Sequence, residues 1–119
     1  MKDFSRTDRL AAQISREVSE ILSVNTHMPA GLFISITEVQ LSKDLRVGKI
    51  FYSAFGGEDA AEKAEIFLKD NYKQIRMELA HRIRVKFIPE LVFTYDASIE
   101  RGQRIHELLD RIKQDEEQQ

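Results

Sequence analysis

Residues 75–96 read IRMELAHRIRVKFIPELVFTYD, and the two halves of this stretch follow different hydrophobic periods. The first half places its aliphatic residues at the spacing of an amphipathic helix. After Pro89, the residues Leu91, Phe93 and Tyr95 recur at every second position, which is the period of a β-strand. The proline marks the junction, because it cannot continue a helix. The stretch therefore predicts an α+β chain in which a helix leads directly into a strand.

A basic block spans the helical half of this stretch. Positions 73–86 hold five basic residues and one acidic residue, a net charge of +4, whereas the whole chain carries −2. The five are Lys73, Arg76, Arg82, Arg84 and Lys86, and the acid is Glu78. Such a block in an acidic chain indicates an anionic partner, with nucleic acid as the first candidate. On this block alone, an ordinary solvated helix face is an equally good interpretation.

Length and composition limit the class of protein. A chain of 119 residues fits one domain, and 42% hydrophobic with 32% charged residues is typical of a soluble globular protein. The chain has no cysteine, which excludes a disulfide scaffold, a thiolate zinc site and a cysteine nucleophile. No apolar run is nearly as long as a membrane-spanning helix, which needs about 20 residues. The N-terminus also lacks the apolar core of a signal peptide. We expect a cytoplasmic protein without a membrane partner.

The C-terminal end differs from the rest of the chain. Residues 114–119 read QDEEQQ and hold three of the twenty acids, so residues 1–113 carry eighteen basic and seventeen acidic side chains, a net charge of +1. Because the segment has no apolar side chain to bury, we expect a disordered tail at 114–119 that folding does not need. The domain is expected at 1–113, and any binding must use local patches of charge.

The segments before the basic block predict a helix and a β-hairpin. Residues 7–23 have an apolar stripe at helical spacing, and Ser5 with Asp8 approximates a capping box. Residues 32–41 and 45–54 are rich in β-branched and aromatic residues and flank a short turn. The alternation changes parity within the first of these strands. A bulge near Thr37 and Glu38 would restore one apolar face.

Residues 58–83 follow a helical pattern that is too long for one straight helix. It would measure about 39 Å, whereas a compact domain of this length is only about 35 Å across. We expect a break at residues 70–73 with Asn71 as the pivot, because Asn competes for backbone hydrogen bonds and tolerates left-handed geometry. Asp96 or Ser98 can cap a last helix with the stripe Ile99, Ile105, Leu108, Leu109 and Ile112. The predicted order is α-β-β-α-α-β-α, a three-stranded sheet covered on one face by helices.

Motifs of enzyme chemistry are absent from the sequence. There is no phosphate-binding loop, dinucleotide fingerprint, zinc-protease helix or nucleophile elbow. His27, His81 and His106 are too scattered to share a metal ion, and only His81 lies in the basic block. We therefore predict no catalytic residue, no metal and no cofactor or small-molecule substrate.

The basic residues are the candidate RNA-binding side chains. Lys69, Lys73 and Arg76 are spaced to share one helical face, and a second cluster lies at the hairpin. Arginine and lysine suit phosphate, and arginine also stacks on unpaired bases. Tyr52 and Tyr72 are the aromatic candidates to meet a base, whereas Phe51, Phe67 and Phe93 are expected in the core. The predicted set is Lys43, Arg46, Lys69, Lys73, Arg76, Arg82, Arg84 and Lys86.

Three motifs in order resemble the ribosome-binding factor A family. They are a Ser-x-Asp-Leu turn at residues 42–45, a Pro-Glu-Leu-x-Phe strand at residues 89–93, and an Asp-x-Ser entry to the last helix at residues 96–98. The resemblance extends from end to end of the chain. It implies a type II KH-like fold and a bacterial factor that binds the small ribosomal subunit late in assembly. It further implies that the protein assists maturation of the 5′ end of the small-subunit rRNA and supports growth in the cold. It implies no catalytic activity.

The chain departs from that family at the helix break. Ordinary KH domains carry a Gly-x-x-Gly loop there and this family an Ala-x-Gly, whereas the matching positions here are Asn71, Tyr72 and Lys73. The sequence thus favours a monomeric KH-like module, with Asn71 and Tyr72 at its kink, that docks on small-subunit rRNA. An adaptor that contacts ribosomal proteins instead is the alternative among binding proteins. A nuclease that processes rRNA is the enzyme alternative.

Overall fold

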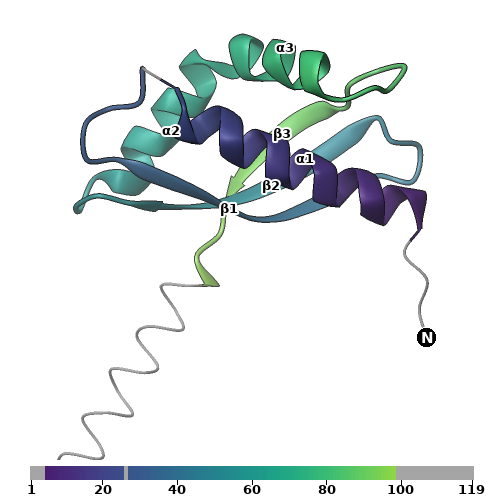
Figure 1. Cartoon of the computed structure of the whole chain (residues 1–119). Helices are drawn as coiled ribbons and strands as arrows, with labels where there is room; N and C mark the ends of the chain where they lie inside the picture. Colours follow the sequence, from purple (N-terminus) through teal and green to yellow (C-terminus); the bar gives the residue numbers. More distant parts are fainter. Residues whose placement is uncertain (1–4, 26, 99–119) are drawn as a thin grey trace, which may run out of the picture.

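The computed structural model describes residues 5–25 and 27–98, and these form an α+β fold with the predicted order of elements (Figure 1). The elements are α1 (Arg6–Ser23), β1 (Phe33–Leu41), β2 (Val47–Phe55), α2 (Ala60–Asp70), α3 (Tyr72–Arg82) and β3 (Glu90–Tyr95). The last helix expected after Ser98 and the tail at 114–119 lie outside the described residues. None of the helices in the described ranges is long and apolar enough to cross a membrane.

The three strands form one mixed sheet in the order β1-β2-β3, and the three helices cover one of its faces (Figure 1). β1 and β2 are antiparallel, whereas β2 and β3 are parallel. The predicted bulge is confirmed, since Ile36 pairs with Tyr52 and Glu38 pairs with Phe51, which leaves Thr37 as the extra residue. The bulge places residues on both sides of it against the helices despite their different parity.

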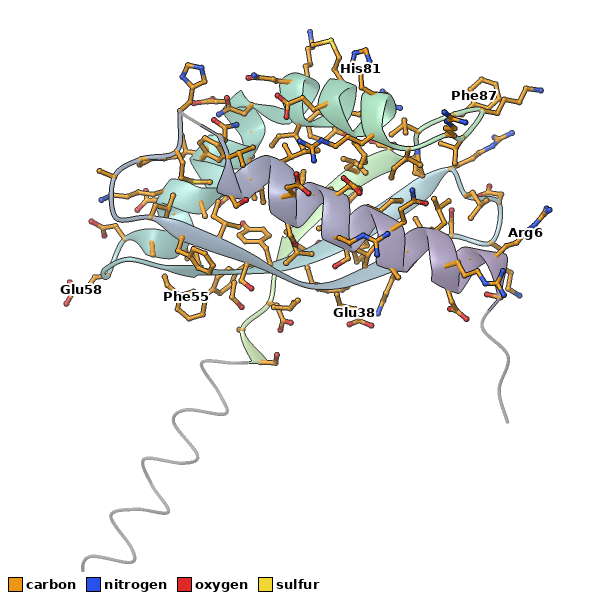
Figure 2. All side chains as sticks on the ribbon, viewed as in Figure 1. Arg6, Glu38, Phe55, Glu58, His81 and Phe87 are labelled. Carbon is orange, nitrogen blue, oxygen red and sulfur yellow. The ribbon has the colours of Figure 1, made fainter. Side chains whose placement is uncertain are left out.

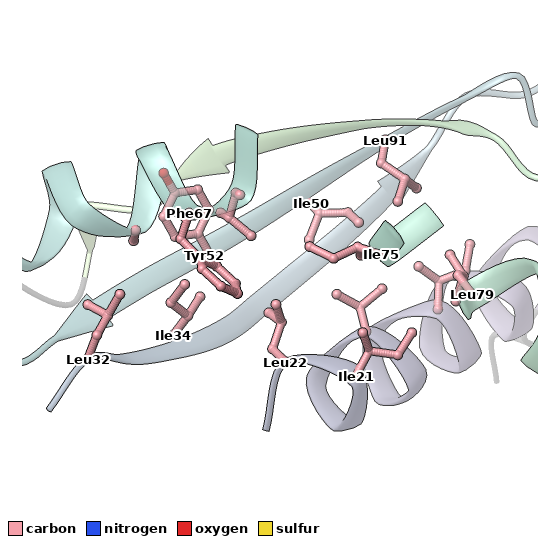
Figure 3. Packing of buried hydrophobic residues seen from close by; sticks show 14 of the residues in the cluster. Ile21, Leu22, Leu32, Ile34, Ile50, Tyr52, Phe67, Ile75, Leu79 and Leu91 are labelled. Atoms are coloured by element: carbon pink, nitrogen blue, oxygen red, sulfur yellow. The ribbon is translucent and has the colours of Figure 1, made fainter. Parts of the chain in front are cut away.

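The core lies between the helices and the sheet (Figure 3). The six largest of the almost completely buried side chains come from α1, β2 and α3: Ile14, Val18, Ile21, Ile50, Ile75 and Leu79. Burying one such side chain stabilises a fold by about 1.5–3 kcal/mol, so this cluster fixes α1 and α3 on the sheet. The predicted capping box is also present, because the Ser5 hydroxyl accepts from the Asp8 amide and the Asp8 carboxylate accepts from the Ser5 amide.

The long helical pattern is broken at Asn71, as predicted. α2 ends at Asp70, α3 begins at Tyr72, and Asn71 has φ −107° and ψ 12°. The Asn71 side-chain amide donates to the Phe67 carbonyl at 2.9 Å. The expectation that Asn71 would draw on left-handed geometry is wrong, since its φ is negative. Backbone of this kind is open to any residue, which explains why the chain bends here without glycine.

The hairpin turn is held by the serine and aspartate of the Ser-x-Asp-Leu motif. The Ser42 hydroxyl donates to the Asp44 carboxylate at 2.7 Å, and the same carboxylate accepts from the Arg46 amide at 3.1 Å. The Ser42 hydroxyl also accepts from the Val47 amide at 3.0 Å. These bonds support Leu45, a non-glycine residue with a φ of 60°. The motif therefore fixes the turn that presents Lys43 and Arg46.

We predict that the Asp44 carboxylate in this turn makes the stability of the fold weakly dependent on pH in the acidic range. The Ser42 hydrogen bond, followed by the Arg46 amide, lowers the pKa of Asp44 below its usual 3.8. A lowered native pKa stabilises the fold above about pH 4, and this contribution is lost as pH falls through the native pKa. Because the turn is exposed, Asp44→Asn should lower the Tm at pH 7 by only about 2 °C. Melting curves from pH 7 to pH 2 should converge for the two proteins, and a gap that persists at pH 2 would contradict this account.

Candidate nucleic-acid interface

The fold brings the hairpin turn and the connection between α3 and β3 to the same end of the molecule (Figure 1). The Glu90 amide donates to the Arg46 carbonyl at 2.8 Å, and Glu90 pairs with Val47 at the start of the parallel ladder. Lys43 in the turn and Arg84 and Lys86 in the connection therefore lie at the same end of the fold, although about forty residues separate them in the chain. Two basic clusters of the sequence become one basic end.

Four of the predicted cations have no ion-pair or hydrogen-bond partner in the described fold. Lys43, Lys73, Arg84 and Lys86 are exposed, and the ion pairs and side-chain hydrogen bonds found within residues 5–25 and 27–98 involve none of them. A cation without an internal partner can bind phosphate without breaking a bond of the fold. These four residues, which we call the free cations, are the strongest candidates for the interface.

Two of the predicted arginines are bonded within the fold. Arg76 donates to the Ile88 carbonyl at 2.8 Å and to the Pro89 carbonyl at 3.4 Å, which fastens the connection to α3. Arg82 lies 3.3 Å from Glu17 and 3.2 Å from Glu20, and its side chain is only 30% exposed. The hydrogen bonds to Glu17 and then to Glu20 raise the pKa of Arg82. Arg82 therefore ties α3 to α1.

The two remaining predicted cations make weak exposed pairs. Arg46 lies 3.9 Å from Asp44, and Lys69 lies 3.3 Å from Glu65 one helical turn before it. Exposed pairs of this kind contribute little, so both cations stay available to a ligand. The structure nevertheless separates Lys69 from the next two basic residues. Lys69 lines a cavity between α2 and β3, whereas Lys73 and Arg76 line a second cavity, between α3 and the connection to β3. The three residues, which the sequence spacing placed on one helical face, are therefore split between two surfaces by the kink at Asn71.

Both tyrosines that the sequence offered to a base pack against other aromatic rings of the fold. Tyr52 is 3% exposed and packs edge-on against Tyr95 with ring centroids 5.7 Å apart. Its burial, with a smaller effect of Glu65, raises the pKa of Tyr52. The Tyr72 hydroxyl accepts from the Leu91 amide at 3.0 Å, and its ring packs against Phe93. Both rings are structural, because each is already packed against another aromatic ring.

Sequence reasoning missed the most exposed aromatic side chain of the described residues. Phe87 is 78% exposed and lies in the connection between Lys86 and Ile88, where Figure 2 shows it at the outer edge of the molecule. Phe51, expected in the core, is only half-buried and has the Lys49 ammonium 5.8 Å from its ring centre. His81 is exposed on α3 (Figure 2). The signal for Phe87 was its place directly after Arg84 and Lys86, in a segment too short for a helix.

The family model of ribosome-binding factor A matches residues 6–109. The chain belongs to the ribosome-binding factor A family. Ribosome-binding factor A of Microcystis aeruginosa is 42% identical over 118 residues, which cover 97% of this chain and 91% of the relative. The crystal structure of ribosome-binding factor A from Thermus thermophilus matches with a TM-score of 0.62 at 28% identity, over 75% of this chain and 93% of that one.

A second structural neighbour shows the Thermus thermophilus factor in a complex. It is a homology model of ribosome-binding factor A fitted into a cryo-EM map of a complex with 30S. It matches with a TM-score of 0.58 at 28% identity, over 73% of this chain and 91% of that one. The expected family is thus confirmed. The residues that carried the resemblance build the hairpin turn at Ser42 and Asp44 and the entry to β3, where Pro89 directly precedes the strand.

Proposed function

We propose that this protein binds the small ribosomal subunit through its basic end, which contacts rRNA, and assists late maturation of the subunit. The observation that carries the proposal is the gathering of Lys43, Arg84 and Lys86 at one end of the fold, with Lys73 on the adjoining helix and none of the four bonded internally. Membership of the ribosome-binding factor A family and the 30S complex of the Thermus relative support the subunit as the partner.

The maturation step follows from the family resemblance. We expect the protein to help mature the 5′ end of the small-subunit rRNA and to support growth in the cold, as a monomer and without catalysis of its own. Binding energy is sufficient for such a role, since a factor that binds one conformation of the rRNA shifts the population toward it. A metal-dependent cleavage assay on precursor rRNA tests the nuclease alternative directly.

One observation favours the adaptor that contacts ribosomal proteins. The face of the sheet that the helices leave uncovered exposes Phe33 and Phe55, whose rings lie 6.3 Å apart. Figure 2 shows Phe55 on this face. Exposed apolar side chains that adjoin one another are typical of protein contacts. The two candidate functions differ in the force that drives binding, which is electrostatic for rRNA and largely hydrophobic for the adaptor.

Salt dependence of binding separates the two candidates. The protein should co-sediment with small subunits, and the logarithm of the association constant should fall with the logarithm of salt with a slope of magnitude about 3–4 if four phosphates are neutralised. Mature ribosomes serve as the control and should retain less protein. A complex with small subunits that is indifferent to salt would favour contacts with ribosomal proteins.

The kink at Asn71 is predicted to matter more for binding than for stability. Asn71→Ala removes the hydrogen bond to the Phe67 carbonyl and favours a straighter helix, which would move Lys73 relative to the connection. We expect subunit affinity to fall about tenfold, while the free energy of unfolding changes by no more than about 1 kcal/mol. Asn71→Gly, which keeps the bend easy, is the matched control and should bind nearly normally. Normal binding by Asn71→Ala would remove the kink from the interface.

A further inference from the structure

Phe87 is the most exposed of the large apolar side chains in residues 5–25 and 27–98. An exposed ring alone is unremarkable on a protein surface, but the segment that carries this one is fixed on both sides. Ile83 and Pro89 are buried, and Arg76 holds the carbonyls of Ile88 and Pro89. The fold therefore presents the ring on an anchored segment and leaves it outside the core.

A cavity of about 600 Å³ lies between α3 and the connection that carries Phe87. Its apolar lining includes Met77, Val85 and Phe87, and its charged lining includes Lys73 and Lys86. Met77 is itself more than half exposed. The volume lies within the range of about 300–1,000 Å³ that is usual for small-ligand sites. An apolar surface with a cationic rim suits a flat apolar ring that carries a phosphate.

The charge around the cavity decides between an RNA and a protein occupant. Lys73, Arg84 and Lys86 are free cations, and the Lys86 ammonium lies 5.7 Å from the centre of the Phe87 ring. The acids that adjoin this segment, Glu78 on α3 and Glu90 on β3, are fewer than the cations. A strand of RNA matches both features, because its phosphates meet the rim while an unstacked base meets the ring.

We propose that Phe87 stacks on an unpaired nucleobase of the rRNA, with the flanking phosphates bound by Lys73, Arg84 and Lys86. The inference rests on the proposed function and specifies its ligand as single-stranded RNA. It predicts that the ring is the part of the interface that distinguishes single-stranded from double-stranded RNA, since a base inside a helix cannot reach a protruding side chain. Removing the ring should weaken binding about tenfold to a hundredfold, the usual effect of losing one stacked base.

The absence of tryptophan from the chain gives a direct probe. Phe87→Trp introduces a single indole, whose fluorescence should be quenched by short single-stranded RNA and much less by a duplex of the same sequence. Phe55→Trp on the uncovered face of the sheet is the matched control and should not respond. In co-sedimentation, Phe87→Ala should lose affinity for small subunits and Phe87→Tyr should retain it. Both should melt like the wild type, because the side chain packs on little.

The outcomes separate this inference from the proposed function. If Phe87→Ala binds subunits as tightly as the wild type, the stacking site is excluded while subunit binding stands. If Phe87→Ala binds weakly but single-stranded RNA leaves the indole at position 87 unquenched, the ring contacts a ribosomal protein and the inference is overturned. Quenching by single-stranded RNA without any binding of the wild type to subunits would support the RNA site and overturn the proposed function.

Discussion

Replacing Lys73, Arg84 and Lys86 together with glutamate is expected to lower the affinity for small subunits at least about a hundredfold and to leave the fold intact. The change reverses three charges, so phosphates that were attracted are repelled and each lost contact also removes its share of counterion release. The three side chains are exposed and make no ion pair in the described residues. Their replacement therefore breaks no ion pair or hydrogen bond of the described residues.

The control for this variant must change the charge of the protein equally at another place. Arg6 and Arg9 on α1 and Lys63 on α2 are exposed, and they too are absent from the ion pairs of the described residues. Reversing these three should weaken binding only slightly. The comparison uses co-sedimentation at one fixed salt concentration, with circular dichroism to show that both variants are folded. Equal losses in the two variants would mean that net charge, and not the basic end, drives binding.

Arg82 is left out of the binding variant for a structural reason. It pairs with Glu17 and Glu20, so glutamate at position 82 would place three carboxylates together and separate α3 from α1. The basic block of the sequence therefore contains residues of two kinds. Arg76 and Arg82 hold secondary-structure elements together, whereas Lys73, Arg84 and Lys86 remain free.

Local patterns were sufficient to predict most of the fold. The capping box at Ser5, the bulge at Thr37 and the break at Asn71 each follow from residues within a few positions of one another, and the structure confirms all three. The change of period at Pro89 likewise marks the boundary of β3. Such features are predictable because neighbouring side chains and short backbone bonds determine them.

Contacts between distant segments were not predictable in the same way. Glu17, one of the two partners of Arg82, lies 65 positions earlier in the chain. The two basic clusters come to one end of the fold because β2 pairs in parallel with β3. Tyr52 and Phe51 were assigned to the wrong faces of β2. The burial of Ile50 fixes the parity of that strand, and Tyr52 follows it into the core. Only the assembled fold determines which basic side chains lack an internal ion pair.

Gly56→Ala is expected to destabilise the fold more than any other glycine substitution in the described residues. Gly56 directly follows β2 and has a φ of +131°. An added Cβ would lie 2.1 Å from the Gly31 carbonyl oxygen and 3.2 Å from the Leu32 Cα. The backbone conformation alone costs about 1–3 kcal/mol for a residue with a side chain. The obstructing atoms belong to the backbone that leads into β1, so the overlap cannot be relieved by turning a side chain. We expect a loss of about 3–5 kcal/mol in urea unfolding.

Two other glycines separate the conformational cost of the positive φ from the cost of the steric overlap. Gly57 has a φ of +104° with nothing within 4 Å of an added Cβ, so Gly57→Ala should show the conformational cost alone. At Gly48 an added Cβ would meet the flexible Leu41 side chain at 3.1 Å, and Gly48→Ala should change stability by no more than about 1 kcal/mol. The three variants should therefore rank with Gly56→Ala least stable and Gly48→Ala most stable. If Gly56→Ala and Gly57→Ala proved equally stable, the close approach of the β2 end to Gly31 would not constrain the fold, and only the positive φ would.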